Sequence, residues 1–245
     1  MQTTDLAAIE ASRLGYIPDQ QPLHHLPRLP RIPSRYLRPG FLRQRLAQPI
    51  DWAVEPLFAQ EFVHTFAAYP DARQAAVCVP LIEREHGLSV LLTRRAGHLV
   101  HHAGQICFPG GRVEHTDQSA IHTALRETHE EVGIAPHFIQ ALSEEPIFIT
   151  SSRFAMRPVV ALVRPDFQIH TDPAEVAEVF EVPLTVLMDP TRHQLHRLQK
   201  PEQPVRYYFS MRWQHYFIWG ATALVIRNLY HHLAALVQHV EATKP

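Results

Sequence analysis

The sequence has little cysteine, and this scarcity excludes two classes of protein. Cys78 and Cys107 are the only cysteines among its 245 residues, and each lies in an apolar stretch typical of a strand. Two thiols so far apart in the chain do not suggest a disulfide framework or a zinc site. We therefore expect buried, reduced thiols and a cytoplasmic location.

Long apolar runs are also missing. The longest, 216–226, is too short to cross a membrane, because a spanning helix needs about 20 apolar residues. The N-terminus shows no basic segment followed by an apolar run. We therefore expect a soluble protein with no membrane partner.

Neither sign of charge is in excess. The 23 lysines and arginines nearly balance the 24 aspartates and glutamates, which leaves a net charge of −1 and a pI near 7.0. Proteins that bind nucleic acid through its phosphates usually carry a basic excess. We therefore expect a small-molecule partner and no nucleic acid, and we allow for a homodimer.

The first 70 residues differ in composition from the rest. Prolines alternate with arginines over 22–39, which favours extended backbone. Apolar residues at helix-like spacing then predict one or two short helices before residue 70. We divide the chain into an N-terminal arm, 1–70, and a main domain, 71–245.

The main domain shows many short strand patterns and few helices. Residues 75–82 and 88–93 are apolar runs joined by a charged turn, so they predict a hairpin. Further strands are expected at 105–108, 138–142, 147–149, 159–163 and 207–217. Apolar residues at helical spacing predict helices over 120–131 and 220–240. Mixed strands with few helices indicate an α+β fold.

The most informative segment is 110–134, where three carboxylates end the first of these helices. Glu127, Glu130 and Glu131 are spaced so that they project from one helix face. Without a partner they would repel one another and meet the negative end of the helix dipole. A hard divalent cation would neutralise them, because oxygen-only ligands select magnesium, calcium or manganese over zinc.

Residues that flank the carboxylates support this interpretation. Arg126 could hold one carboxylate in place. Gly133 suits the left-handed position just after a helix, and Gly110 and Gly111 allow close backbone approach before it. The alternative is a solvated acidic helix end, but the complete pattern is far more specific than a pair of glutamates.

This segment resembles the Nudix box, whose pattern is Gly-x5-Glu-x7-Arg-Glu-apolar-x-Glu-Glu-x-Gly-apolar. Asp117 stands at the first Glu position, and eight residues rather than seven separate it from Arg126. Thr128 stands at a position that is usually apolar. The resemblance implies a Nudix domain over 71–245, folded as an α/β/α sandwich with a mixed sheet and a loop-helix-loop motif.

One Nudix branch, the coenzyme A pyrophosphatases, is similar beyond the box. It shares the aspartate and the one-residue insertion, and its upstream signature is Leu-Leu-Thr-x2-Ser-x3-Arg-x3-Gly-x3-Phe-Pro-Gly-Gly. The chain matches most of that signature between Leu91 and Gly111, with Ala96 in place of the serine. Val100 stands where the signature has arginine, and valine cannot make a charge-assisted contact with a phosphate.

The resemblance implies a hydrolase that cuts the diphosphate of coenzyme A or an acyl derivative, releasing 4′-phosphopantetheine and 3′,5′-ADP. Glu127, Glu130 and Glu131 would bind the cofactor, Mg²⁺ or Mn²⁺, and orient water for attack. The substrate would contact Arg95, Gly104, Phe108, Gly110 and Gly111.

The resemblance also suggests further catalytic residues. Besides Glu130, these are Arg126 and a glutamate from a late loop that accepts a proton. Glu175 matches the family pattern best, and Glu178 is second.

Two other functions remain open. The chain could hydrolyse another nucleoside diphosphate compound, such as ADP-ribose, a dinucleotide or a nucleoside triphosphate, and Val100 favours this alternative. It could instead be a non-catalytic ligand-binding Nudix domain, although the intact glutamates argue against that.

Overall fold

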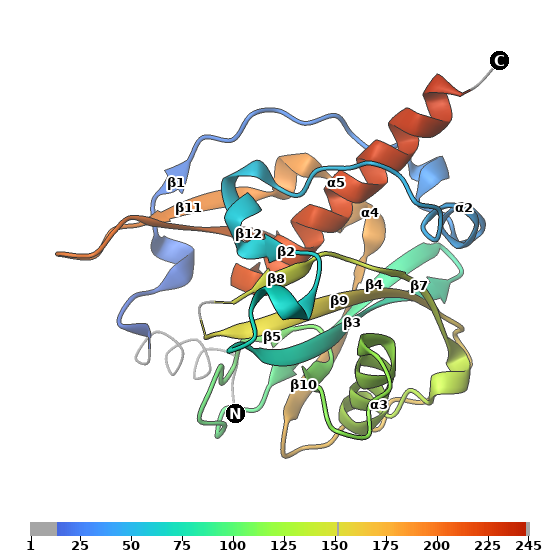
Figure 1. Ribbon diagram of the computed structural model, residues 1–245, viewed down its shortest axis with the longest axis horizontal. Helices are drawn as coiled ribbons and strands as arrows, with labels where there is room; N and C mark the ends of the chain where they lie inside the picture. The colour runs from blue at the N-terminus through green and yellow to red at the C-terminus, as the bar shows by residue number, and fades with distance from the viewer. Residues whose placement is uncertain (1–13, 151, 244–245) are drawn as a thin grey trace.

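The computed structural model describes residues 14–150 and 152–243, and Figure 1 shows their arrangement. Long strands cross the middle of the molecule, with α3 (Ala120–Val132) on one side and α5 (Gly220–Ala242) on the other. This confirms the predicted α+β sandwich with a mixed sheet. In the described parts of the chain, no helix is long and apolar enough to cross a membrane.

The larger sheet has nine strands. They are β2 (Phe62–Val63), β3 (Arg73–Arg84), β4 (Gly87–Arg95), β5 (Ile106–Cys107), β6 (Gly110–Arg112), β7 (Ile139–Glu144), β8 (Ile147–Ile149), β9 (Phe154–Val163) and β10 (Val176–Pro183). The main path runs β10-β4-β3-β9-β8-β2, while β5 pairs with β4, β6 with β3 and β7 with β9. β3 and β9 are parallel and the other pairs are antiparallel.

Both faces of the central strands are buried, so their side chains alternate between two hydrophobic layers. Val79 and Leu81 of β3 join the large cluster that includes α5. Cys78 and Ile82 point to the opposite layer, where they pack with residues of α3. The sheet therefore fixes α3 against β3.

A second, antiparallel sheet has four strands in the order β1-β11-β12-β13. They are β1 (Leu23–His24), β11 (Gln194–Leu198), β12 (Arg206–Trp213) and β13 (Tyr216–Trp219). α5 packs on β12, and its buried side chains share the large hydrophobic cluster with residues of β3 and β4, so the helix joins the two sheets. The sequence predicted a single strand over 207–217, whereas the structure has a hairpin whose turn includes Gln214, with φ of 51°.

Short helices fill the connections. They are α2 (Pro39–Arg45) and α4 (Leu184–Leu187), with the 3-10 helices η1 (Pro18–Gln20), η2 (Ser34–Tyr36), η3 (Pro56–Glu61), η4 (Phe66–Ala68), η5 (Pro136–Phe138) and η6 (Pro190–Arg192). The helix-like spacing before residue 70 thus corresponds to one α-helix and to 3-10 turns.

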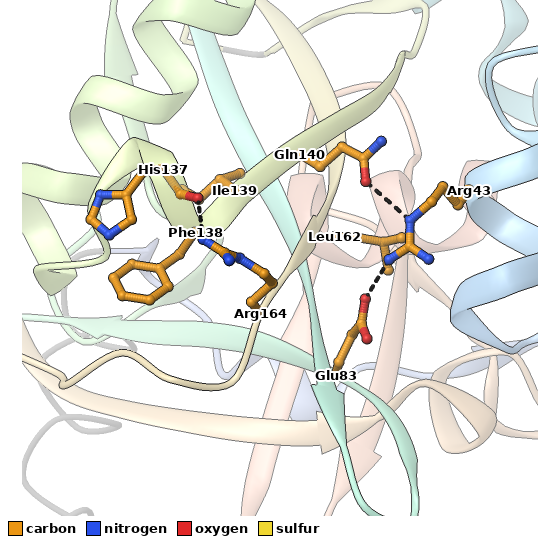
Figure 2. Close-up of a pocket in the computed structure, with 8 residues that line it drawn as sticks. All are labelled: Arg43, Glu83, His137, Phe138, Ile139, Gln140, Leu162 and Arg164. Carbon is orange, nitrogen blue, oxygen red and sulfur yellow. Dashed lines mark hydrogen bonds and ion pairs between the residues drawn. The ribbon is translucent and has the colours of Figure 1, made fainter.

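The N-terminal segment packs on the main domain. Leu37 and Leu42 are buried in the large hydrophobic cluster. Figure 2 shows how α2 is tied to the sheet at a shallow pocket: Arg43 donates to Glu83 of β3 at 2.8 Å and to Gln140 of β7 at 3.1 Å. These side-chain contacts and the buried leucines hold the segment against the edge of the larger sheet.

Candidate active site

Helix α3 carries the three glutamates near its C-terminal end. It begins after Ser119, whose hydroxyl accepts a hydrogen bond from the His122 backbone N–H at 3.1 Å. It ends at Gly133, whose φ of 79° is the left-handed conformation that glycine adopts without strain. The position expected for Gly133 is confirmed.

Arg126 is the centre of a hydrogen-bond network that joins α3 to the preceding loop. Its Nε and Nη2 donate to the two carboxylate oxygens of Asp117, at 3.1 and 2.9 Å. Its Nη1 donates to Glu127 and Glu130, at 2.9 Å each. The Asp117 side chain is buried, and the Arg126 hydrogen bonds hold the pKa of Asp117 well below its usual range. Asp117 therefore reaches Arg126 despite the extra residue between them.

The paired glycines lie where side chains would not fit. A Cβ at Gly111 would lie 2.3–2.6 Å from the carboxylate atoms of Glu127. A Cβ at Gly110 would lie 2.5 Å from the carbonyl oxygen of Ala76 in β3. The glycines thus allow β6 to lie between β3 and α3, directly beside a predicted metal ligand.

Glu131 is the buried member of the three glutamates, with 3% exposure. Burial raises the pKa of Glu131 to about 8, and the positive charge of Arg95 opposes that shift. Glu131 Oε2 and Arg95 Nε are both buried without a hydrogen-bond partner among the described residues. Glu131 and Arg95 therefore each have a buried polar atom that is available to a bound ligand, which is uncommon inside a protein.

Negative charge also gathers around Glu127. Burial raises the pKa of Glu127 against the effect of Arg126, and the charges of Glu130 and Glu175 raise it further. Glu175 is exposed in the loop that leads into β10, and its backbone oxygen accepts a hydrogen bond from the Ala96 N–H at 2.8 Å. The structure thus brings Glu175 into electrostatic reach of the α3 carboxylates.

Glu178 has other partners. Arg94 Nε donates to its carboxylate at 3.0 Å, and the Tyr216 hydroxyl donates at 2.5 Å. Burial opposes a lower pKa for Glu178, but these two hydrogen bonds outweigh it. The sequence did not predict this cluster, because the pairing of β10 with β4 that creates it joins segments far apart in the chain.

Two of the predicted substrate-binding residues, Phe108 and Gly104, lie in or near the β4–β5 loop. Phe108 is 3% exposed and packs in the large hydrophobic cluster, and its contact with substrate stays a prediction. Its apolar ring gains more from the core than from a polar site. Gly104 has φ of 76°, and its N–H donates to the Arg95 carbonyl at 3.1 Å. Gly104 thereby turns the β4–β5 loop back toward Arg95.

Two departures from the family patterns also have clear positions. Val100 is 79% exposed in the β4–β5 loop, so a longer side chain there would not enter the core. Thr128 is buried, and its hydroxyl donates to the Ala124 carbonyl at 2.6 Å. This internal hydrogen bond satisfies the hydroxyl group at a position that is usually apolar.

The donor atoms at the end of α3 fit a hard divalent cation. Among the described residues, no three His, Cys, Asp or Glu side chains converge closely enough to form a finished metal site. Arg126 instead supplies positive charge between Glu127 and Glu130, while Glu131 Oε2 has no hydrogen-bond partner in the part of the chain that the structure describes. Because all three donors are carboxylates, Glu127, Glu130 and Glu131 could hold magnesium or manganese in preference to zinc.

Comparisons with known proteins agree with this architecture. The NUDIX domain model matches residues 72–204. The chain is 43% identical over 157 residues to a protein of Enterobacter sp. (strain 638) named "Uncharacterized Nudix hydrolase NudL", covering 64% of this chain and 81% of that protein. A protein of the same name from Cronobacter sakazakii is 44% identical over 158 residues, with the same coverage.

A solved structure, a MutT/nudix family protein from Enterococcus faecalis, is a more distant likeness. It has 17% identity and a TM-score of 0.41, and it covers 70% of this chain and 68% of that chain. At this TM-score the likeness adds nothing to what the sequence relatives show. From the matched domain and these relatives, the chain belongs to the Nudix hydrolase family.

Proposed function

We propose that this Nudix hydrolase cuts the diphosphate bond of coenzyme A or an acyl derivative, using Mg²⁺ or Mn²⁺. The products would be 4′-phosphopantetheine, or its acyl form, and 3′,5′-ADP. The signature between Leu91 and Gly111 and the position of Asp117 support this substrate through their resemblance to the coenzyme A pyrophosphatases.

The observation that carries the proposal is the pair of unused polar atoms beside α3. A buried carboxylate oxygen with no partner is costly, and so is a buried guanidinium nitrogen with none. A cation bound at Glu131 and a phosphate bound at Arg95 would satisfy both atoms. Diphosphate chemistry supplies these two groups together.

Each residue of the site has a separate role in this reaction. Glu127, Glu130 and Glu131 hold the cation, which when bound offsets negative charge on the diphosphate oxygens. Arg126 positions Glu127 and Glu130 through its hydrogen bonds at 2.9 Å. Arg95 binds a phosphate oxygen.

Glu175 acts as the proton acceptor for the attacking water. It is exposed, and its charge acts on both Glu127 and Glu131, which supports a place at the edge of the same site. Glu178 is less suited because Arg94 and Tyr216 already donate to its carboxylate.

A second candidate is hydrolysis of another nucleoside diphosphate compound, such as ADP-ribose. Val100 favours it, because the branch that cuts coenzyme A has an arginine at this position. The exposed valine leaves the loop without the cation that would contact an additional phosphate group.

A substrate panel separates the candidates. Purified protein would be incubated with magnesium and coenzyme A, ADP-ribose, a dinucleotide or a nucleoside triphosphate, and the products identified by mass spectrometry. The proposal predicts fastest turnover of coenzyme A, with both products ending in phosphomonoesters. Preferred cleavage of ADP-ribose would show that ADP-ribose, and not coenzyme A, is the substrate. If no diphosphate compound were cleaved, the proposed chemistry would be contradicted.

A further inference from the structure

The turn before β10 holds the backbone of Glu175 on both sides. The N–H of Glu175 donates to the Asp172 carbonyl at 3.1 Å, and the Glu175 carbonyl accepts from the Ala96 N–H at 2.8 Å. The Asp172 N–H in turn donates to the Glu131 carbonyl, in the last turn of α3, at 3.1 Å. Backbone hydrogen bonds therefore connect Glu175 both to the helix that carries the three glutamates and to the β4–β5 loop.

A β-bulge sets the register of this turn against β4. Glu178 of β10 lies opposite Arg94, whereas Val176 lies opposite Arg95, so β10 has one extra residue between them. Without that residue, Glu175 would lie one position further along β4, roughly 3.3 Å from its observed position. The bulge thus draws Glu175 toward Arg95. Bulges of this kind are common next to active sites, where they redirect a side chain.

The residue that follows the bulge is fixed by two hydrogen bonds. Arg94 Nε donates to one carboxylate oxygen of Glu178 at 3.0 Å, and the Tyr216 hydroxyl donates to the other at 2.5 Å. Tyr216 is 7% exposed, and its ring stacks on Phe180 of β10 with centroids 3.6 Å apart and an interplanar angle of 2°. The Glu178 carboxylate therefore joins β10 to both β4 and β13 at the bulge.

The burial of Arg94 makes this contact costly to lose. The Arg94 side chain is 9% exposed, and its Nη2 is buried with no hydrogen-bond partner among the described residues. Within residues 14–150 and 152–243, Glu178 is the only carboxylate that forms an ion pair with Arg94. A buried guanidinium is strongly destabilised when its opposite charge is removed, so Glu178 is held beside Arg94.

We propose that Glu178 is a positioning residue for the hydrolysis, which fixes the bulge and so places the Glu175 carboxylate beside the attacking water. Arg94 and Tyr216 hold the Glu178 carboxylate in place. The inference rests on the proposed role of Glu175 as proton acceptor. Because Tyr216 lies on β13, beyond the matched residues 72–204, the β12–β13 hairpin thereby supports the chemistry of the NUDIX domain.

Glu178→Gln is the first test, because glutamine keeps the shape of the side chain but cannot neutralise Arg94. A displacement of about 1 Å in a catalytic group can cost about a hundredfold in rate, so kcat should fall by about tenfold to a hundredfold. KM should change by less than about twofold, since no substrate contact is removed. Kinetics would use magnesium and whichever of coenzyme A and ADP-ribose the wild-type protein cleaves faster.

Glu181→Gln is the matched control. Glu181 lies on the same strand and accepts from Arg84 Nε at 3.0 Å, but it is further from Glu175, on the other side of the bulge. The same chemical change there should leave kcat at the wild-type value. The affinity for Mn²⁺, measured by titration calorimetry, should be the same for both variants and wild type, because the carboxylates of α3 are unchanged.

Tyr216→Phe tests the second donor and keeps the ring that stacks on Phe180. It removes one hydrogen bond to Glu178 without a change in packing, so kcat should fall by about twofold to tenfold, the effect of one hydrogen bond. This variant decides the question if Glu178→Gln does not fold.

A double variant separates positioning from a general structural effect. If Glu178 acts through Glu175, Glu178→Gln should cause no further loss of kcat in a Glu175→Gln protein, whereas a structural role would lower kcat by the same factor in both backgrounds. The Ala96 N–H gives a readout without turnover. Its hydrogen exchange, followed by NMR, should be faster in Glu178→Gln than in wild type and unchanged in Glu181→Gln.

The possible failures are distinguishable. Wild-type kcat for Glu178→Gln, independent losses in the double variant, or unchanged exchange at Ala96 would each overturn the positioning role and leave Glu175 as the proton acceptor. Wild-type kcat for Glu175→Gln would instead refute the proton acceptor itself, and the positioning role with it.

Discussion

Glu130 and Glu131 are adjacent in sequence but differ in burial. The Glu130 side chain is 56% exposed and accepts from Arg126, whereas Glu131 is 3% exposed and its Oε2 has no partner among the described residues. We predict that Glu131→Gln lowers kcat by at least about a hundredfold, because it removes a charge that binds the cation. Without metal it should stabilise the fold by about 1–3 kcal/mol at neutral pH, since glutamine avoids the cost of protonating the buried Glu131 carboxylate, whose pKa is raised to about 8.

Glu130→Gln is the matched control. It should lose activity to a similar extent, but its melting temperature should change little because its carboxylate is solvated. Thermal unfolding in chelator and steady-state kinetics with magnesium would measure both effects. A Glu131→Gln enzyme as active as wild type would refute the assignment of this residue.

Val100 determines the expected preference among substrates. We predict that Val100→Arg lowers KM for coenzyme A by about tenfold to a hundredfold, and changes KM for ADP-ribose less, because a charge-assisted hydrogen bond contributes roughly 1.5–3 kcal/mol. The variant should fold normally, since Val100 is 79% exposed. His101→Arg, at an exposed neighbouring position, controls for added charge. An equal change in KM for both substrates would show that position 100 does not select coenzyme A.

On the scale of secondary-structure elements, β6 and α3 meet at a glycine. A Cβ at Gly111 would lie 2.3–2.6 Å from the carboxylate of Glu127, which is the mobile end of a side chain. We predict that Gly111→Ala displaces this carboxylate, so that kcat falls at least about tenfold while the free energy of unfolding changes by less than about 1 kcal/mol.

Gly40→Ala is the comparison for that variant. Gly40 lies in α2, and a Cβ added there would have no atom of the described residues within 4 Å. Alanine should therefore leave activity unchanged and slightly stabilise the helix. Kinetics and denaturant unfolding of the two variants would be compared. Full activity of Gly111→Ala would contradict the close fit between β6 and the metal-binding carboxylate.

The elements with strong local signals were predictable from the sequence. The periodicity of α3 and α5 and the charged turn between β3 and β4 all correspond to elements of the structure. The strands β10 and β11 were not predicted. β10 reads Val-Ala-Glu-Val-Phe-Glu-Val-Pro, and its glutamates pair with arginines of other strands, Glu178 with Arg94 of β4 and Glu181 with Arg84 of β3. Such stabilisation is tertiary and leaves no local signal.

The candidate site was likewise predictable only where it depends on local structure. The shared face of Glu127, Glu130 and Glu131 follows from helix geometry, and α3 extends over all three. The burial that separates Glu131 from Glu130 depends on how α3 packs against β6. The contact of Arg126 with Asp117 depends on the conformation of the loop before the helix. The burial of Phe108 in the large hydrophobic cluster is likewise a tertiary property that the signature alone does not indicate.

At the scale of the whole molecule, a buried polar network joins the N-terminal segment to α5. Arg227 Nε donates to Glu55 at 2.7 Å, and its Nη1 donates to His193 Nδ1 at 3.1 Å. Since arginine only donates, His193 is neutral, with its Nε2–H donating to the Leu187 carbonyl at 2.7 Å. Burial, with the nearby Arg227 charge, lowers the pKa of His193 to about 4.

This lowered pKa gives a pH dependence of stability. Between about pH 6.5 and about pH 4 the unfolded chain binds a proton at His193 that the folded chain does not. Stability should therefore fall as the pH drops through this window, by about 3 kcal/mol from this residue. His193→Gln should lose less stability across the window, and His137→Gln, at an exposed position, should behave as wild type. Identical pH profiles for His193→Gln and wild type, measured by urea unfolding, would refute the prediction.

The measurement that tests the central proposal most directly is coenzyme A hydrolysis by protein stripped of metal, before and after magnesium is added. The enzyme should be inactive unless a cation is bound by the carboxylates at the end of α3. Turnover should therefore be absent in chelator and should return with magnesium or manganese. Sustained cleavage of the diphosphate in metal-free buffer would contradict the account.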